Sequence, residues 1–495
     1  MCALAAAILS ACATNGSGSR LSLPQRFRMS ESQLSTFLEA RSGRIAIVRN
    51  DGNVMLTDQT GSVTVTLTSD AGTALARDRS SAVSARYVLP IWSPDASRLA
   101  LLELRSAQPL TQETTLEGLL GVFVQAQPGS RMQEQTLGGA ISHDITDAEQ
   151  FAFEPRRVTL EFAGRHMSSA LYTVSPNGPG PLKEILYSEE PIEYVDWSPI
   201  GDSLGVLTRG KDAQTLTVVA SDGSRRQSVA EGVQLRWNWN ADGEDLLTQT
   251  RSGVTVRKAV TGEKVVTIEA GGDASVSSQF SPDGKMLAIA RYDGTETALV
   301  LADRNGVEQR TIAKVRGEVH YAWSPKGDAL AFIAREDGRL GGALRIVNTA
   351  AGEPQLLSSA PVVGFFWSPD GTRIASFSPL ELGLMSSDDN TPSAVSEDSA
   401  NPMLVQTIEV AQGAAGARKV LYMDPSRRFL ALLVDFDRYN HAVTIWSPNS
   451  RRLVVPFSVG VGQGGGVDYV AEMEASGSIW PRVLGEGSLA VWSPR

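Results

Sequence analysis

Apolar and polar positions along the chain alternate in short runs separated by polar turns, a pattern that predicts many short β-strands. Six of these runs end in an aromatic residue, followed by a Ser-Pro or Asn-Ala step, a polar turn and another apolar run. The six aromatic residues are Trp92, Trp197, Trp239, Phe280, Trp323 and Trp367. From Trp197 onward they recur at intervals of 42, 41, 43 and 44 residues. This period, with several strands per unit, predicts a β-propeller.

The turn after each aromatic residue has a defined chemistry. In Trp367-Ser-Pro-Asp-Gly371, proline presets φ, aspartate can bond its own backbone, and glycine accepts a positive φ. An apolar run with a small third residue comes next, as in Met286-Leu-Ala-Ile-Ala290. Because small side chains suit strands that crowd around an axis, we expect the turn to lead from the outermost strand of one blade to the innermost strand of the next. The aromatic side chain is expected to be buried between neighbouring blades.

Counting the apolar runs gives the number of blades. Runs that could begin a blade start near residues 45, 98, 203, 245, 286, 329, 373 and 428. We therefore predict an all-β propeller of four-stranded antiparallel blades over residues 44–495, with eight blades favoured and seven as the alternative. The last apolar run, Ser488-Leu-Ala-Val-Trp492, is placed to close the ring against the first blade.

Two regions depart from the period. Between Trp92 and Trp197 lie 105 residues, more than two repeats, so residues 108–167 are either a blade extension or a degenerate blade. Residues 379–404 form a polar loop, after which Leu421-Tyr-Met-Asp-Pro425 takes the place of the motif. Repeat proteins accept insertions where packing does not constrain the chain, and such loops often bind partners.

A family resemblance rests on these repeats. The W-S-P-D-G turn followed by an Ile/Leu-Ala-Phe-like strand resembles the WD-repeat-like blades of the TolB family of bacterial propellers. The resemblance covers roughly residues 44–495 and is strongest between 195 and 377. It implies a periplasmic partner of the cell-envelope machinery. Two departures put a specific TolB assignment in doubt: no N-terminal α/β domain is recognisable before the blades, and a lipid anchor is not expected of TolB.

The first residues resemble a bacterial lipoprotein signal. Ala3 to Leu9 is apolar, and Leu9-Ser-Ala-Cys12 has the form of a lipobox, so residues 1–11 are predicted to be a signal peptide and Cys12 the lipidated residue. Residues 12–43 would then form a flexible tether and a short helix. No Lys or Arg precedes the apolar run, so either the true start lies upstream or the likeness is accidental. The predicted location is the cell membrane or outer membrane, with the propeller outside the cytoplasm.

Composition excludes several function classes. Cys2 and Cys12 are the only cysteines, which excludes disulfides, Cys-zinc sites and Cys nucleophiles from the propeller. A net charge of −10 and a pI near 5.2 argue against nucleic-acid binding. The four histidines, including His320 and His441, show no metal-ligand spacing, and no catalytic motif is present. We therefore predict no catalytic, cofactor-binding or metal-ligating residues, no cofactor, and a protein that is not an enzyme.

The favoured function is a protein-binding scaffold at the cell envelope. Its predicted partner is another envelope protein or a peptidoglycan-associated component, and residues 108–167 are the expected principal contact surface. The alternative is a cell-surface carbohydrate-binding protein or enzyme that uses the axial channel. Three or more titratable side chains converging at one mouth of the channel would favour this alternative, whereas an apolar patch built by loops on a rim would favour the scaffold.

Overall fold

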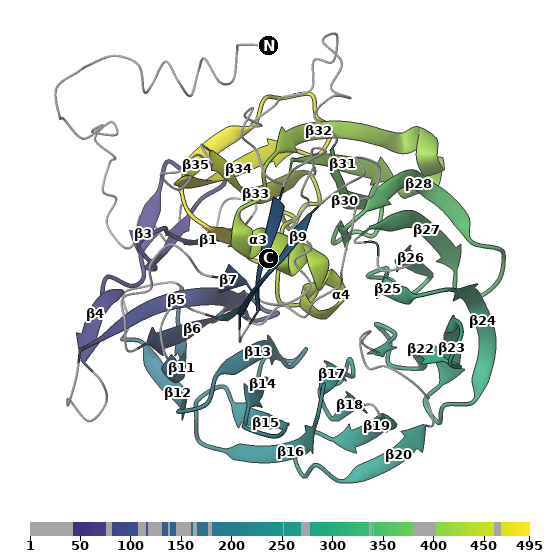
Figure 1. Ribbon diagram of the computed structural model, residues 1–495, viewed down its shortest axis with the longest axis horizontal. Helices are drawn as coiled ribbons and strands as arrows, with labels where there is room; N and C mark the ends of the chain where they lie inside the picture. The colour runs from purple at the N-terminus through teal and green to yellow at the C-terminus, as the bar shows by residue number, and fades with distance from the viewer. Residues whose placement is uncertain are drawn as a thin grey trace.

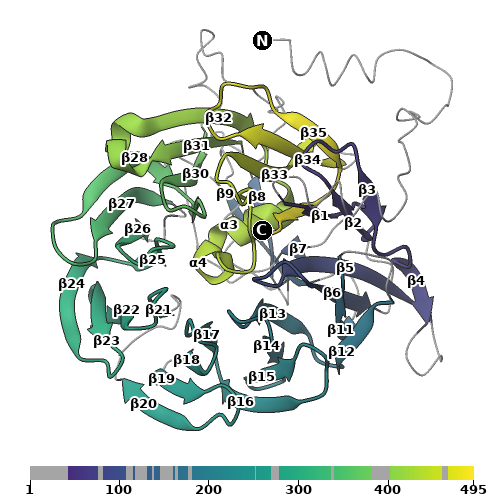
Figure 2. The same ribbon diagram turned by 180° about the vertical axis from the view of Figure 1, so that it is seen from behind.

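The chain forms an eight-bladed β-propeller, which confirms the predicted fold class and the count of eight blades (Figure 1). The computed structural model describes residues 43–75, 82–106, 166–176, 181–250, 252–268, 278–335, 339, 341–380, 402–459 and 467–495, together with four short strands between residues 115 and 161. The two N-terminal predictions, a lipidated Cys12 and a short helix before residue 43, lie outside these described residues. The same ring is seen from behind in Figure 2.

Within each blade the strands are antiparallel and follow one another from the axis outward. Blade 1 consists of β36 (Leu489–Trp492), β1 (Ile45–Val48), β2 (Val54–Thr57) and β3 (Thr64–Thr66). Blade 2 consists of β5 (Ala82–Trp92), β6 (Leu99–Ser106), β11 (His166–Val174) and β12 (Lys183–Ser188), and β4 (Gly72–Leu75) pairs with the start of β5. Blade 3 consists of β13 (Ile192–Trp197), β14 (Ser203–Arg209), β15 (Gln214–Ala220) and β16 (Arg226–Gly232). Blade 4 consists of β17 (Arg236–Trp239), β18 (Asp245–Thr250), β19 (Gly253–Lys258) and β20 (Lys264–Ile268). Blade 5 consists of β21 (Gln279–Phe280), β22 (Met286–Tyr292), β23 (Thr297–Asp303) and β24 (Glu308–Val315).

The remaining blades complete the ring. Blade 6 consists of β25 (Glu318–Trp323), β26 (Ala329–Arg335), β27 (Gly342–Asn348) and β28 (Gln355–Val362). Blade 7 consists of β29 (Gly364–Trp367), β30 (Arg373–Pro379), β31 (Met403–Glu409) and β32 (Ala417–Met423), with the 3₁₀ helix η3 (Val410–Gly416) before β32. Two helices follow, α3 (Arg427–Val434) and α4 (Phe436–Tyr439). Blade 8 consists of β33 (Arg452–Val459), β34 (Val467–Glu474) and β35 (Arg482–Glu486), joined on the inside by a single bridge between Trp446 and Leu453.

The motif turn lies inside a blade, so the expectation that it connects two blades is wrong. Trp197 ends β13, the innermost strand of blade 3, and pairs directly with Leu204 on β14, the second strand. The backbone N–H of Ser198 donates to the carbonyl of Ser203 at 2.9 Å, which closes a tight hairpin between the two strands. Strands joined by so short a loop become neighbours in one sheet. The small third residue therefore belongs to the second strand.

Two further copies of the motif complete the set of eight. Trp446-Ser-Pro448 belongs to blade 8, and Trp492-Ser-Pro494 ends β36, which pairs with β1 and forms the innermost strand of blade 1. The alignment of Leu421–Pro425 with the motif is wrong, because residues 421–423 end the outermost strand of blade 7. The blade start expected near residue 428 is also wrong, because that segment is α3.

The motif tryptophans connect adjacent blades. The indole N–H of Trp197 donates to the carbonyl of Ile91, the residue before the equivalent Trp92, at 3.0 Å. The same bond joins three other pairs of blades at 3.1 to 3.3 Å, from Trp446 to Phe366, from Trp367 to Ala322 and from Trp92 to Val491. Of the six aromatic residues singled out in the sequence, five are buried and Trp367 is half-buried. Trp92, Trp197 and Trp367 therefore combine a buried apolar area with a bond to the neighbouring inner strand, whereas Trp239, Phe280 and Trp323 contribute buried apolar area alone.

The two faces of the disc differ. One face, called here the Ser-Pro face, carries the turns that follow the motif aromatics, six of them Ser-Pro turns and the one in blade 4 an Asn240-Ala241 turn. The opposite face, called here the connection face, carries the links between the second and third strands of each blade, because the second strand runs away from the Ser-Pro turns and the third strand runs back toward them. Ser106 pairs with His166 and Pro379 with Met403, so the residues between them, 107–165 and 380–402, both leave from the connection face.

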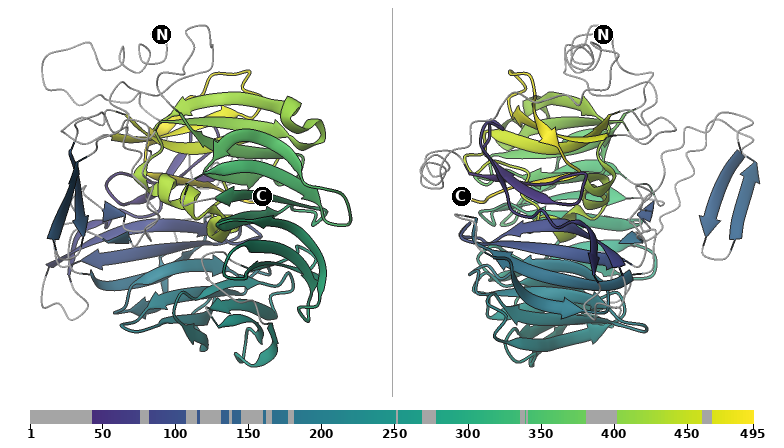
Figure 3. Two further views of the ribbon diagram at one scale, coloured as in Figure 1. Left: turned by 45° about the vertical axis from the view of Figure 1, so that its right-hand side comes forward. Right: turned by 90° about the vertical axis from the view of Figure 1, so that its left-hand side faces the viewer.

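The long region after β6 is thus an elongated link within blade 2 rather than a separate blade. Its described parts are two strand pairs, β7 (Thr115–Leu116) with β10 (Leu160–Glu161), and β8 (Arg131–Thr136) with β9 (Gly139–Asp144). Figure 3 shows the β8–β9 hairpin standing off the disc. The apolar run at residues 119–124 lies outside the described residues. Among the described helices, none has the length and apolar character needed to span a membrane.

Candidate functional site at the propeller axis

The centre of the ring is occupied by α3 and α4, called here the axial helices (Figures 1 and 2). The side-chain oxygen of Ser426 caps α3 by accepting the backbone N–H of Phe429 at 3.2 Å. Its hydroxyl also donates to the carbonyl of Ser488 at 2.6 Å, which ties the helix start to blade 1. Phe429, Leu433 and Phe436 are fully buried. The axial helices are therefore part of the core.

One repeat position supplies much of the contact with the axial helices. Three residues before the motif aromatic, blades 3, 4, 6 and 7 carry Tyr194, Arg236, His320 and Gly364. The Tyr194 hydroxyl donates to the carbonyl of Arg438 at 2.7 Å. Gly364 allows a close approach, because a Cβ there would lie 2.5 Å from the carbonyl oxygen of Leu433. The start of each inner strand lies toward the connection face, so the axial helices are held from that side.

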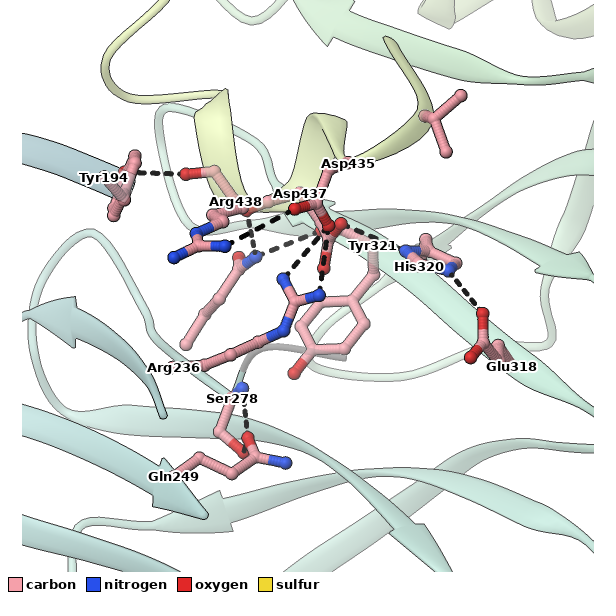
Figure 4. A network of polar contacts seen from close by, with 12 residues as sticks. Tyr194, Arg236, Gln249, Ser278, Glu318, His320, Tyr321, Asp435, Asp437 and Arg438 are labelled. Atoms are coloured by element: carbon pink, nitrogen blue, oxygen red, sulfur yellow. Dashed lines mark hydrogen bonds and ion pairs between the residues drawn. The ribbon is translucent and has the colours of Figure 1, made fainter. Parts of the chain in front are cut away.

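Asp437 is the centre of the polar network in Figure 4. Its side chain is 0% exposed, and its Oδ1 lies 3.0 Å from Nδ1 of His320. The amide of Gln279 in blade 5 donates to the Asp437 carbonyl at 3.3 Å. Burial by itself raises the pKa of the Asp437 carboxyl, but His320, with Arg236 and Arg335, lowers it below its ordinary value. Asp437 is therefore an ionised group buried among cations.

A second carboxylate connects the axial helices to blade 4. Both terminal nitrogens of Arg236 lie 3.1 Å from Oδ1 of Asp435. Burial lowers the pKa of Arg236, but Asp435 and Asp437 outweigh that effect and leave it raised. The guanidinium of Arg438 lies 4.8 Å from the centre of the Tyr194 ring, a cation–π contact. These pairs fix α4 against blades 3 and 4.

Blade 6 contributes a third set of contacts. Arg335 is 4% exposed and donates from Nη2 to the carbonyls of Val434 at 2.7 Å and Val363 at 2.8 Å. Its Nη1 lies 3.0 Å from Nε2 of His320, and the same Nε2 lies 3.2 Å from a carboxylate oxygen of Glu318. Arg335 therefore links the end of α3 to the start of β29. His320 links α4 to β25.

In the sequence analysis, three or more titratable side chains converging at the axial channel were the criterion that would favour a carbohydrate-binding protein or enzyme. The side chains described above converge at the axis. These groups, however, bind the chain's own helices: the side chains of His320 and Asp437 are 1% and 0% exposed. Sequence reasoning treated His320 as an isolated histidine and missed the site. The signal was present in the repeat, because aligning the blades on the motif aromatic places Tyr194, Arg236 and His320 in one column. No group of three His, Cys, Asp or Glu side chains able to hold a metal occurs among the described residues.

Comparison with known proteins gives structural matches alone. No family model and no curated protein sequence matches the chain. A putative TolB from Agrobacterium tumefaciens is 14% identical, with 55% of this chain and 95% of that chain covered and a TM-score of 0.31. Hydrazine synthase of Kuenenia stuttgartiensis is 18% identical, with 58% and 78% covered and a TM-score of 0.39. An oligogalacturonate lyase in complex with manganese is 14% identical, with 79% and 96% covered and a TM-score of 0.42.

These matches concern the fold. They include TolB propellers, at TM-scores of 0.31 and 0.32, and the part of the predicted resemblance that the structure shows is the β-propeller fold itself. The prediction that the chain is not an enzyme is contradicted, because the matches also include two enzymes, hydrazine synthase and the lyase. A propeller can host catalysis, and the lack of a catalytic motif in the sequence does not exclude it.

Proposed function

We propose that this chain is a lipid-anchored, extracytoplasmic propeller that binds another envelope protein or a peptidoglycan-associated component through its connection face. Cys12, in the lipobox-like Leu9–Cys12 segment, would carry the lipid. Residues 13–19, Ala-Thr-Asn-Gly-Ser-Gly-Ser, would separate the anchor from the ring. The resemblance of the repeat to TolB blades supports an envelope location.

The difference between the two faces carries this proposal. On the Ser-Pro face the hairpins are short and alike, closed by a motif serine or, in blade 4, by Asn240. On the connection face the two longest links leave the ring, residues 107–165 and 380–402, near the ends at which the axial helices are held. A rigid ring with long links on one face is a typical arrangement for binding, because the scaffold positions the loops without being altered by them.

The test shortens each long link to the length found in blade 3. There Arg209 and Gln214 pair across a four-residue connection, residues 210–213. Replacing residues 107–165 by this connection should preserve the hairpin of β6 and β11 and abolish cross-linking to the partner in membranes. The matched variant, with residues 380–402 replaced, should keep the partner if the blade 2 link is the principal contact. A partner retained by both variants would contradict binding through this face.

A second candidate, carbohydrate binding, is favoured by a cavity between blades 6 and 7. The cavity has a volume of about 310 Å³, and its lining includes the half-buried Trp367 with Asn348, Glu353 and Gln355. An aromatic ring beside amide and carboxylate groups suits a sugar ring with its hydroxyls. Oligosaccharide binding measured by calorimetry should disappear when Glu353 and Gln355 are both replaced by alanine. Binding that survives this change, or no binding in the unaltered chain, would remove this candidate.

A further inference from the structure

His320 has one ring nitrogen with a fixed role. Nδ1 lies 3.0 Å from the Asp437 carboxylate, which can only accept a hydrogen bond when it is ionised. Nδ1 therefore carries a proton in both the neutral and the cationic form of the ring. The change of charge must occur at Nε2.

Nε2 faces two neighbours with opposite requirements. Nη1 of Arg335, at 3.0 Å, is a permanent donor. The Glu318 carboxylate, at 3.2 Å, is an acceptor. In the neutral ring, the Nε2 lone pair accepts from Arg335, and Nε2 has no proton to donate to Glu318. In the cation, Nε2–H donates to Glu318 and repels Arg335. Each protonation state satisfies one neighbour and leaves the other without this bond.

We infer that His320 is a proton-operated switch at the propeller axis, in which Nε2 exchanges its hydrogen-bond partner between Glu318 and Arg335. Glu318 begins β25 on the connection face, and its side chain is 32% exposed. When His320 is protonated, Glu318 is held toward the axis. When His320 loses its proton, Arg335 gains an acceptor inside, and Glu318 loses the bond from Nε2. The switch is independent of the proposed partner, so each can fail without the other.

The charged groups around the His320 imidazole set the pH range in which the switch operates. Asp437 faces the imidazole from α4, Arg335 from β26 and Glu318 from β25. The apolar ring of Phe436 in α4 also lies beside it, and Phe365 of β29 packs on Phe436. Burial lowers the pKa of His320 and Arg335 lowers it further, but Asp437 and Glu318 outweigh both and leave the pKa above its ordinary value of 6.5. Arg236 and Asp435 act more remotely, through the network around Asp437.

The state of His320 can be followed directly. In the full chain labelled with ¹⁵N-histidine, long-range nitrogen–proton spectra distinguish the tautomers, and His320→Gln identifies the signal among the four histidines. We expect His320 to titrate above pH 6.5, with the proton remaining on Nδ1 at high pH. Titration below pH 6.5, or a proton on Nε2 at high pH, would overturn the inference.

Two variants should move this pKa in opposite directions. Glu318→Gln removes the charge that favours the cation and should lower the His320 pKa by about one unit, whereas Arg335→Gln should raise it. Glu296→Gln makes the same change as Glu318→Gln in a surface turn of blade 5 and should leave His320 unaffected. If burying a glutamine at position 335 prevents folding, the partly exposed position 318 still decides. An unchanged His320 pKa in Glu318→Gln would show that the carboxylate is not its partner.

Discussion

Replacing Gly205 by alanine tests how blades 3 and 4 pack. Gly205 occupies the small third place of the second strand, where blades 2, 5, 6 and 7 carry alanine. A Cβ at this position would lie 2.2 Å from Cη2 of Trp237 on the next inner strand. Trp237 is 6% exposed and its ring packs between Trp239, at 5.8 Å between ring centres, and Tyr194, at 5.5 Å. Either the ring or β14 must shift.

The expected cost follows from two opposing effects. Overpacking a core costs about 1–3 kcal/mol. Against this, replacing glycine by alanine restricts the unfolded chain and stabilises by about 0.4–1 kcal/mol. Gly205 does not have a positive φ, so alanine meets no backbone strain there. We therefore expect Gly205→Ala to destabilise the fold by about 1–2 kcal/mol, measured as a lower midpoint of urea unfolding.

A second substitution decides whether Trp237 is the cause. Trp237→Leu removes the ring atoms nearest to position 205 and will itself destabilise the core. In that background Gly205→Ala should become neutral or stabilising, because the unfolded-state effect then stands alone. If Gly205→Ala costs the same in both backgrounds, or stabilises the unaltered chain, the packing described between blades 3 and 4 is wrong.

Three further predictions concern single residues. Gly284→Ala should destabilise the fold more than Gly371→Ala. Both glycines have φ near 70°, but a Cβ would lie 2.1 Å from Asn240 Oδ1 at position 284 and at least 3.5 Å from any neighbour at position 371. Equal midpoints of urea unfolding for the two variants would contradict this prediction. Burial raises the pKa of Asp196 to about 7, so its ionisation destabilises the fold as the pH rises from about 4 to 7. Asp196→Asn should therefore stabilise the chain at pH 8, by up to about 4 kcal/mol, and not at pH 4; equal effects at both values would argue against a buried carboxyl. Cys12→Ala should move the protein from the membrane fraction to the soluble fraction, and unchanged membrane association would refute lipidation.

The blade count could be obtained from the sequence because the motif turn needs particular residues. A serine that closes the hairpin, a proline and a residue with positive φ recur at a fixed spacing, and φ is near 70° at Gly201 and Gly327. Two copies were missed because they deviate from that pattern. In the Trp446 copy, Asn449 and Ser450 replace both the aspartate and the glycine of the motif, with Ser450 taking the positive φ, and the Trp492 copy ends with the chain three residues later.

The position of the motif within the blade could not be obtained from the same pattern. Local sequence shows that two strands are joined by a tight turn, but not which strand lies at the axis. Small residues after the turn suggested crowding around the axis. Their cause is instead a contact between blades, as at Gly205 beneath Trp237. Such a contact joins residues 32 positions apart and has no local sequence signature.

The axial helices show why the site escaped sequence reasoning and why it has the composition it has. A ring of eight blades leaves more space at its centre than inner-strand side chains can fill, so an inserted segment with Phe429, Leu433 and Phe436 completes the core there. An inserted helix brings unpaired backbone carbonyls at its end, and these must be satisfied once they are buried. Arg335 and the Tyr194 hydroxyl supply those donors from blades 6 and 3. The buried cations in turn require Asp435 and Asp437, so the polar network follows from filling the axis with a helix, and it includes in His320 a side chain whose ordinary pKa lies close to neutral.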